Sequence, residues 1–247
     1  MDIDVLVVGA GPAGLTLAAE LGLAATDALV VEQLPGRSPF CRGFNLNARS
    51  LALLDRRGIV ERFLAEGPTV TSTAFAGGIR LDLSALEAEH PYVLGIPQTR
   101  VEELLEERAV ELGVAVYRGH RLTALRQDAH GVVATVDTQA GPARITARYL
   151  VGCDGGRRTV RRLAGIDFPG APASRYMLLG DVALADPDAL PFWPTTTEHG
   201  SVFVIPRPGY VRVTGVVGGG HQWSAWRSLL TDALAQLGCL ISPAAAG

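Results

Sequence analysis

The sequence has no lysine, because all 22 of its basic residues are arginines. A lysine that forms a Schiff base, or one that binds phosphate in a P-loop, is therefore excluded. Arginine is still suited to phosphate groups, since its planar guanidinium donates paired hydrogen bonds. The formal net charge of −3 gives no indication of nucleic-acid binding.

Long apolar runs are also lacking. A membrane-spanning helix needs about 18 or more consecutive apolar residues. The most apolar stretch, residues 6–25, is interrupted by glycines and a proline, and no basic residue precedes it. We therefore expect neither a membrane span nor a signal peptide.

Patterns for metal binding and for disulfides are absent as well. The three cysteines, Cys41, Cys153 and Cys239, are scattered and odd in number, which favours a reducing, cytoplasmic location. The histidines have no ligand spacing, so no metal site is predicted. They are His90, His120, His130, His199 and His221.

The sequence does contain alternating strands and helices. Its 247 residues, 48% of them hydrophobic, suffice for one large domain or two small ones. An apolar, β-branched run over residues 3–10 predicts a buried strand. A helix is expected from Pro12, which is a good first-turn residue, and a second strand over residues 28–33. This order predicts an α/β fold.

The clearest helix is expected over residues 99–113, where Thr99 and Glu102 form a candidate capping box and Gly113 ends the pattern. Another helix is expected over residues 48–58, with Asn47 as its N-cap. Four strands are then predicted, the last three as antiparallel hairpins. They span residues 114–119, 121–127, 131–138 and 143–155.

A glycine-rich loop joins the first strand to the first helix. Gly9, Gly11 and Gly14 complete the pattern G-x-G-x-x-G, which allows a tight turn, close approach to a pyrophosphate and helix–strand packing. Glu32 ends the second strand, where a carboxylate accepts hydrogen bonds from ribose hydroxyls and repels a 2′-phosphate. The loop predicts a bound FAD or NAD. The alternative is a plain strand–helix turn with Glu32 in solvent.

A second glycine loop follows the strand at residues 149–152. Asp154 and Gly155 can reach toward a bound cofactor, or they can form an ordinary helix cap with solvated arginines behind them. Arg42 lies in a loop after the second strand. It can pair with a pyrophosphate, or it can be a plain surface arginine.

Taken in order, these segments resemble the FAD-dependent aromatic hydroxylases, which are single-component flavoprotein monooxygenases with the p-hydroxybenzoate hydroxylase fold. More narrowly, the chain is similar to the branch that tailors aromatic polyketides in antibiotic biosynthesis. The resemblance runs from residue 1 to about residue 217. The segments that carry it are residues 4–21, 30–33, 42–63, 95–114 and 150–170.

The resemblance implies a fold and a domain organisation. The fold would be α/β, with a Rossmann-like (GR2-type) FAD-binding domain and an incomplete antiparallel β substrate domain. Residues 1–73 and 98–165 would form the FAD-binding domain, and residues 74–97 and 166–217 the substrate sheet. Residues 218–247 match nothing in that family and form an atypical tail.

The resemblance also implies site residues. The first glycine loop would bind the FAD pyrophosphate, Glu32 and Gln33 the adenosine, and the backbone at Leu122 would lie near adenine. Arg42 and Gln98 would lie near the cofactor, and Asp154 with Gly155 would serve both FAD and NADPH. No catalytic side chain is identified. The loop residues are Gly9, Gly11, Pro12, Ala13 and Gly14.

The implied reaction is hydroxylation of an aromatic small molecule by O2, with FAD bound and with NADPH or NADH as a transient reductant. The Gly-Asp flavin motif of that family is absent, so we expect a truncated enzyme with weak turnover alone. One alternative is a non-enzymatic FAD-binding remnant or helper acting as a homodimer or with a complementing partner chain. Another is an NAD-dependent dehydrogenase.

Overall fold

A computed structural model of the chain describes residues 2–75, 79–157, 159–171, 175–182, 194–197, 200–207 and 210–218. The tail expected over residues 218–247 lies outside the described residues from residue 219 onward, as do His199, His221 and Cys239. The chain divides into two compact units, Met1–Phe168 and Pro169–Gly247. Each unit is described by itself.

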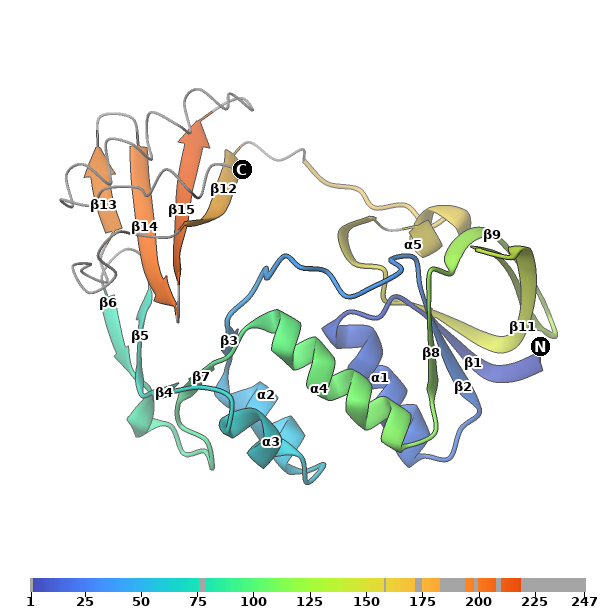
Figure 1. The fold of residues 1–247 in the computed structure, drawn as a ribbon, viewed down its shortest axis with the longest axis horizontal. Coiled ribbons are helices and arrows are strands. Elements are labelled where there is room, and N and C mark those ends of the chain that lie inside the picture. The colour runs from blue at the N-terminus through green and yellow to red at the C-terminus, as the bar shows by residue number, and fades with distance from the viewer. Residues whose placement is uncertain are drawn as a thin grey trace. The chain divides into compact units, whose positions relative to one another are not determined.

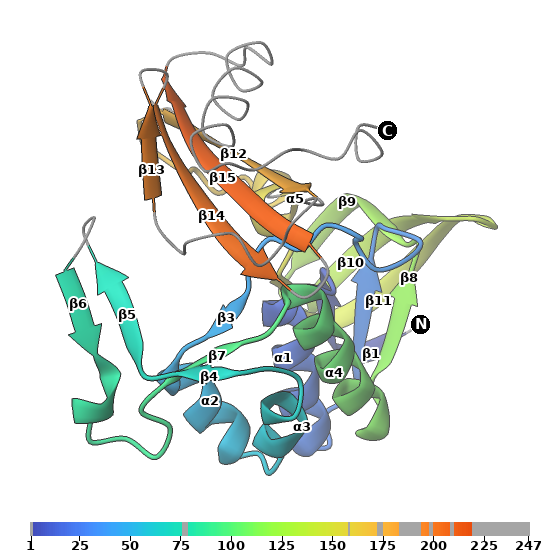
Figure 2. The same ribbon diagram turned by 60° about the vertical axis from the view of Figure 1, so that its left-hand side comes forward.

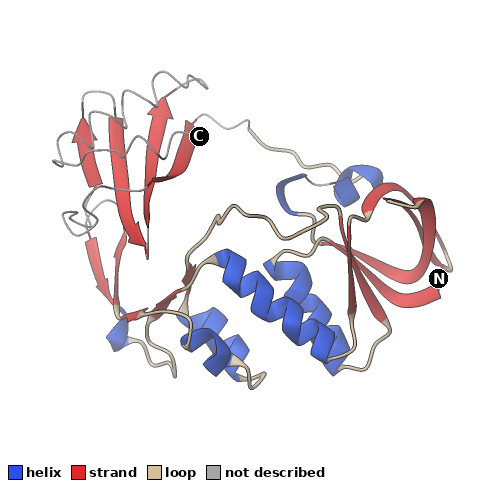
Figure 3. Ribbon diagram, viewed as in Figure 1, coloured by secondary structure: helices blue, strands red, loops and turns tan. Residues whose placement is uncertain are grey.

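The first unit is built on a six-stranded sheet that confirms the α/β class (Figures 1 and 3). Four neighbouring strands are parallel, and the last two continue the sheet antiparallel. In spatial order they are β8 (Ala115–Arg118), β2 (Ala28–Glu32), β1 (Asp2–Val8), β11 (Gly141–Gly152), β10 (Gly131–Thr138) and β9 (Arg121–Asp128).

The two faces of the parallel strands pack against different layers. Val5, Val7 and Val30 lie in a core cluster with apolar residues of the helices. Leu6 and Leu29 lie in a second cluster with residues of β9, β10 and β11. Side chains alternate between the faces of a strand, so a strand buried on both faces needs an uninterrupted apolar run. Such a run is formed by residues 5–8 of β1 and residues 28–31 of β2.

β11 changes partner along its length. Residues 141–147 pair with β10, and residues 146–152 pair with β1. Beyond Ala147, the edge of β11 opposite β1 has no strand partner among the described residues. Tyr149 is 63% exposed on this stretch and Val151 is 37% exposed. The first unit therefore carries an open sheet edge with apolar side chains beside it.

The helices α1 (Pro12–Leu23) and α4 (Gln98–Glu111) run side by side, as both views show (Figures 1 and 2). α2 (Ala48–Asp55) and α3 (Val60–Leu64) follow in the same core. The predicted N-cap of α2 is confirmed, because Asn47 Oδ1 accepts a hydrogen bond from the Ser50 N–H at 2.9 Å.

The capping box predicted for the fourth helix is wrong. α4 begins at Gln98, one residue earlier than expected, and its N-cap is Pro97, which offers no side-chain acceptor. Thr99 therefore lies inside the first turn. Glu102 accepts a hydrogen bond from Gln98 Nε2 at 2.8 Å instead of reaching back to the cap.

Shorter elements complete the first unit. β3, β7 and β4 form a three-stranded sheet, and β5 and β6 form a hairpin. Their bounds are β3 (Asn45–Leu46), β4 (Thr69–Val70), β5 (Ser72–Phe75), β6 (Ile79–Asp82), η1 (Leu83–Ala85) and β7 (Val93–Gly95). After β11 come η2 (Gly155–Arg157) and α5 (Thr159–Leu163).

The second unit contains an antiparallel sheet in the order β12-β15-β14-β13. Arg212 is only 2% exposed, and its Nε donates to Asp181 Oδ1 at 2.6 Å, so its buried charge is compensated. The strands are β12 (Arg175–Val182), β13 (Pro194–Thr197), β14 (Gly200–Arg207) and β15 (Tyr210–Gly218). Within the described part of the chain, no helix has the length and apolarity to span a membrane.

Candidate functional site

A cavity of about 660 Å³ opens at the carboxyl ends of β1, β2 and β11. In open α/β sheets ligands bind at this edge, because the loops that follow the parallel strands gather there. Eleven of the twelve residues predicted from the sequence line the cavity, and only Gly14 does not. The eleven are Gly9, Gly11, Pro12, Ala13, Glu32, Gln33, Arg42, Gln98, Leu122, Asp154 and Gly155.

Two of the three glycines of the first loop, Gly9 and Gly14, leave no room for a side chain. A Cβ on Gly9 would lie 2.4 Å from the Cys153 carbonyl oxygen, and the φ of Gly9 is +111°. A Cβ on Gly14 would lie 1.9 Å from the Gly9 carbonyl oxygen. Both glycines therefore let backbone pack on backbone.

Gly11 differs from the other two, because a Cβ there would meet no atom within 4 Å. It is the N-cap of α1, has no side-chain cap, and lines the cavity. The free N–H groups of the first turn and the helix dipole both favour an anion at this place.

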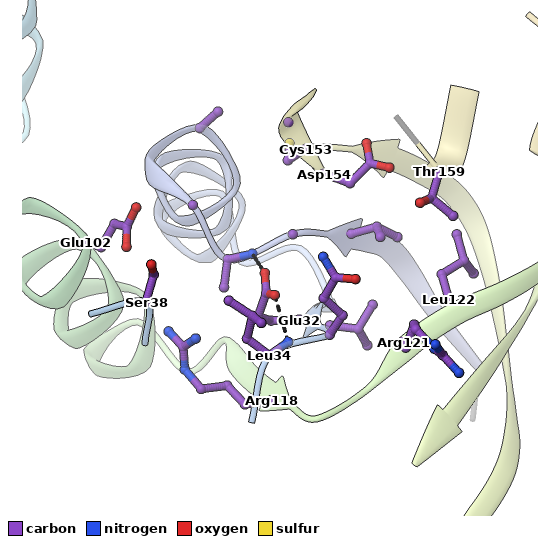
Figure 4. Close-up of a pocket in the computed structure, with 18 of the residues that line it drawn as sticks. Glu32, Leu34, Ser38, Glu102, Arg118, Arg121, Leu122, Cys153, Asp154 and Thr159 are labelled. Atoms are coloured by element: carbon purple, nitrogen blue, oxygen red, sulfur yellow. Dashed lines mark hydrogen bonds between the residues drawn. The ribbon is translucent and has the colours of Figure 1, made fainter. Parts of the chain in front are cut away.

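Glu32 links the two loops that follow β1 and β2 (Figure 4). Its Oε2 accepts a hydrogen bond from the Ala10 N–H at 3.0 Å, and its Oε1 accepts one from the Leu34 N–H at 2.9 Å. A carboxylate oxygen accepts two hydrogen bonds, so each keeps capacity for a ligand hydroxyl. The sequence did not predict this structural role.

The segment after β2 is fastened to α4 by Arg37. Its Nε donates to Glu106 Oε2 at 2.8 Å, and its guanidinium also donates to Glu103 at 3.1 Å. Glu106 accepts a further pair of hydrogen bonds from Arg118, which lines the cavity. Burial acts to raise the pKa of Glu106, but the hydrogen bonds and charges of the two arginines outweigh it and hold the pKa below its usual value.

Arg42 and Gln98 are brought together at the cavity. The Gly43 carbonyl accepts a hydrogen bond from the Gln98 N–H at 2.8 Å, which docks the Arg42 loop on the start of α4. Among the described residues, the Arg42 side chain has no hydrogen bond or ion pair. An unpaired guanidinium beside the open start of a helix leaves its donors available to an anion.

The second glycine loop combines the two roles that the sequence left open. Asp154 Oδ2 accepts a hydrogen bond from the Val160 N–H at 2.9 Å, which organises the turn into α5. Asp154 also lines the cavity, and Gly155 makes the turn with a φ of +60°. Burial, with the neighbouring charge of Asp154, raises the pKa of the Cys153 thiol and so favours its protonated form.

Sequence analysis missed several lining residues. Arg118 is the last residue of β8 and lies opposite Glu32 in the pairing of β8 with β2, and His120 follows the strand. The carboxyl end of a third parallel strand was the signal that could have found them. Phe40 also lines the cavity and is 76% exposed, but nothing in its sequence context marks it.

These features suit a ligand with a diphosphate and a ribose, because an open helix N-terminus faces the same cavity as a strand-end carboxylate. The fold and the site define the chain as a dinucleotide-binding α/β protein. It belongs to a family described as FAD binding domain, which matches residues 2–234.

Several relatives are named monooxygenases, and one, from Streptomyces rugosporus, is named dialkyldecalin synthase. Over 182 residues, the chain is 48% identical to the 12-dehydrotetracycline 5-monooxygenase/anhydrotetracycline 6-monooxygenase of Streptomyces rimosus, covering 73% of this chain and 36% of that protein.

Solved structures of hydroxylases share the fold. The anhydrotetracycline hydroxylase of Streptomyces rimosus aligns with a TM-score of 0.87 and 39% identity, covering 98% of this chain and 51% of that one. An aklavinone-11 hydroxylase, solved with FAD and aklavinone, aligns with a TM-score of 0.79 and 25% identity, covering 95% and 50%. The chain therefore spans at most about half the length of these relatives.

Proposed function

We propose that this chain binds FAD as part of an NAD(P)H-dependent monooxygenase that hydroxylates an aromatic polyketide. The observation that carries the proposal is the cavity itself, in which the open Gly11 turn and the Glu32 carboxylate face the same space. The substrate class is proposed because anhydrotetracycline and aklavinone appear in the names of the related hydroxylases.

The chain's residues would divide the work of holding FAD. The N–H groups of Gly11 and Ala13 would donate to the pyrophosphate, whereas Pro12, which has no N–H, would contribute only its shape. Arg42 and the Asp154–Gly155 turn complete this end of the cavity. Gly9 and Gly14 act indirectly, because they let the loop pack closely.

The adenosine end would be held by Glu32 and Gln33, with the Leu122 backbone beside the adenine. The Glu32 carboxylate would accept hydrogen bonds from the ribose hydroxyls and would repel a 2′-phosphate. NADPH carries that phosphate, so it would reduce the flavin from elsewhere and only transiently.

Bound FAD, once reduced, supplies the chemistry that transfers one oxygen atom of O2 to the aromatic ring. The protein's part is to bind, to orient and to exclude water. No side chain is assigned as a catalytic acid or base. We also propose that residues 1–73 and 98–165 form the FAD domain, that residues 74–97 and 166–217 belong to the β-sheet portion of the substrate domain, and that the protein is cytoplasmic.

The second candidate function is an FAD-binding helper that works with a complementing chain or as a homodimer. The open edge of β11 beside Tyr149 and Val151 favours this candidate, because such an edge accepts a further strand.

One experiment separates the two candidates. The purified chain is mixed with FAD, NADPH or NADH, isotopically labelled O2 and anhydrotetracycline, with and without the second half of the Streptomyces rimosus relative. Product carrying one labelled oxygen from the chain alone supports the enzyme, and product only in the complemented mixture supports the partner-dependent form. If flavin binds but no product forms in either mixture, the monooxygenase proposal is wrong.

A further inference from the structure

A cluster of potential metal ligands lies away from the cavity. Asp55, Glu89 and His90 each place one ligand atom within 4.8 Å of the others, and none of the three lines the cavity. Asp55 is the last residue of α2, while Glu89 and His90 lie between η1 and β7. We propose that these three residues form a binding site for a divalent metal ion, with Zn²⁺ the best match.

His90 provides the strongest indication of a ligand. The residue is only 7% exposed, and its Nε2 is buried with no hydrogen-bond partner. That atom points toward Asp55, whose Oδ2 lies 3.5 Å away. Buried polar atoms are nearly always satisfied, so an unsatisfied ring nitrogen facing a carboxylate calls for a further partner.

The other ring nitrogen is already occupied. His90 Nδ1 lies 2.9 Å from Tyr92 Oη, and the two rings meet edge to face. Metal-binding histidines commonly donate their second N–H to an oxygen, which fixes the ring and leaves a lone pair on the ligating nitrogen. When Nδ1 donates to Tyr92, the Nε2 lone pair faces the two carboxylates.

The electrostatics of the cluster favour a cation. Two carboxylates converge at the C-terminal end of α2, where the helix dipole is negative. The nearby Arg57 does not neutralise them, because its guanidinium is paired with Glu20 at 2.6 and 2.7 Å. Glu89 is exposed, so an ion and its water ligands can enter.

The donor set of one imidazole and two carboxylates suits Zn²⁺, which binds nitrogen and oxygen ligands at about 2.0–2.2 Å and takes water as a fourth ligand. Binding would require the exposed Glu89 side chain to move closer to the other two. The ion would fasten the segment before β7 to α2, and this role is independent of FAD.

The ordinary alternative is a His–Asp ion pair without a metal. A contact of 3.5 Å is long for such a hydrogen bond. If His90 and Asp55 form only an ion pair, Zn²⁺ should not bind saturably. Replacing Glu89 should then not change Zn²⁺ binding.

The test uses the full 247-residue chain, stripped of metal and loaded with FAD. Zn²⁺ is titrated by competition with a chromogenic chelator, and Tm is measured with and without Zn²⁺. We expect one equivalent to bind and to raise Tm. Asp55→Asn and Glu89→Gln should each weaken binding by at least about tenfold, the usual order for a lost ligand interaction. Glu87→Gln, an exposed neighbour outside the cluster, should leave it unchanged.

Two results would overturn the proposal. One is the absence of saturable Zn²⁺ binding by the folded chain. The other is a Zn²⁺ affinity that is as high in Asp55→Asn and Glu89→Gln as it is in Glu87→Gln. Because the two acidic residues are partly or fully exposed, their variants are expected to fold, and circular dichroism checks this.

Discussion

At the scale of single residues, the same amino acid serves opposite purposes within one loop. Gly14 has no room for a side chain, because the Gly9 carbonyl oxygen already fills the space. Gly11 has room, but that room is the cavity. The G-x-G-x-x-G pattern predicted the loop, and the structure separates the glycines that let the loop pack closely from the glycine that only faces the cavity.

This difference predicts a contrasting pair of variants. Gly14→Ala should lower Tm by several degrees, because overpacking of this kind costs about 1–3 kcal/mol. Gly11→Ala should leave Tm nearly unchanged, since its φ of −83° suits alanine, yet weaken FAD binding at least about tenfold. Differential scanning fluorimetry and flavin titration measure the two effects. Equal loss of stability in both variants would contradict the assignment.

Glu32 has a structural role at the cavity, and we propose that it binds the ribose of FAD as well. Glu32→Gln replaces one acceptor oxygen by an N–H₂ group, so either the Ala10 N–H or the Leu34 N–H loses its partner. We expect FAD affinity to fall by about 10- to 100-fold, the equivalent of about 1–3 kcal/mol for an unsatisfied polar group. Glu61→Gln, in α3 and outside the cavity lining, is the matched control. Equal affinity in the two variants would count against a role for Glu32.

At the scale of elements, the order of strands and helices was predictable because each carries its own periodicity. The α/β class, the antiparallel β9–β10–β11 meander and the Asn47 cap are confirmed. The start of α4 was not predictable, since Pro97 displaced the expected cap. The attachment of the Arg37 segment to α4 was also missed, because it joins residues more than 60 positions apart.

The ion-pair cluster around Glu106 predicts a pH dependence. The pKa of Glu106 lies below its ordinary value of 4.5, because its arginine partners outweigh the effect of burial. Such a carboxylate stabilises the fold above its unfolded pKa, and this contribution is lost as the pH falls through the folded pKa.

Glu106→Gln should therefore melt at a lower temperature than the native chain. This Tm difference should be largest at neutral pH and should shrink below about pH 4.5. Glu111→Gln is the control, because the Arg62–Glu111 pair is 42% and 40% exposed and should contribute less. Thermal melts between neutral and acidic pH measure both variants. A difference for Glu106→Gln that does not change with pH would refute the role of its charge.

At the scale of the whole molecule, the cavity for the dinucleotide lies within the first unit. The chain spans at most about half the length of its relatives. The open β11 edge is the clearest structural sign of a place for more polypeptide. The order of the motifs along the sequence was enough to predict the family. It did not predict the edge, because strand pairing depends on contacts between distant segments.

We expect the second half of the Streptomyces rimosus relative, added in trans, to tighten FAD binding by at least about tenfold. The physical reason is that an added strand and its loops would enclose more of the cofactor. Arg148→Pro is the matched variant, because a proline removes a backbone donor from the open edge. If the added half tightens FAD binding of Arg148→Pro as much as it tightens FAD binding of the native chain, the β11 edge is not where it docks.

The most direct test is a titration of FAD with the purified, folded 247-residue chain, in which quenching of FAD fluorescence measures binding. We expect saturable binding of one FAD per chain, which ADP competes with and Gly11→Ala weakens. If the folded chain leaves FAD fluorescence unchanged, both alone and with the second half of a relative present, the central claim is wrong.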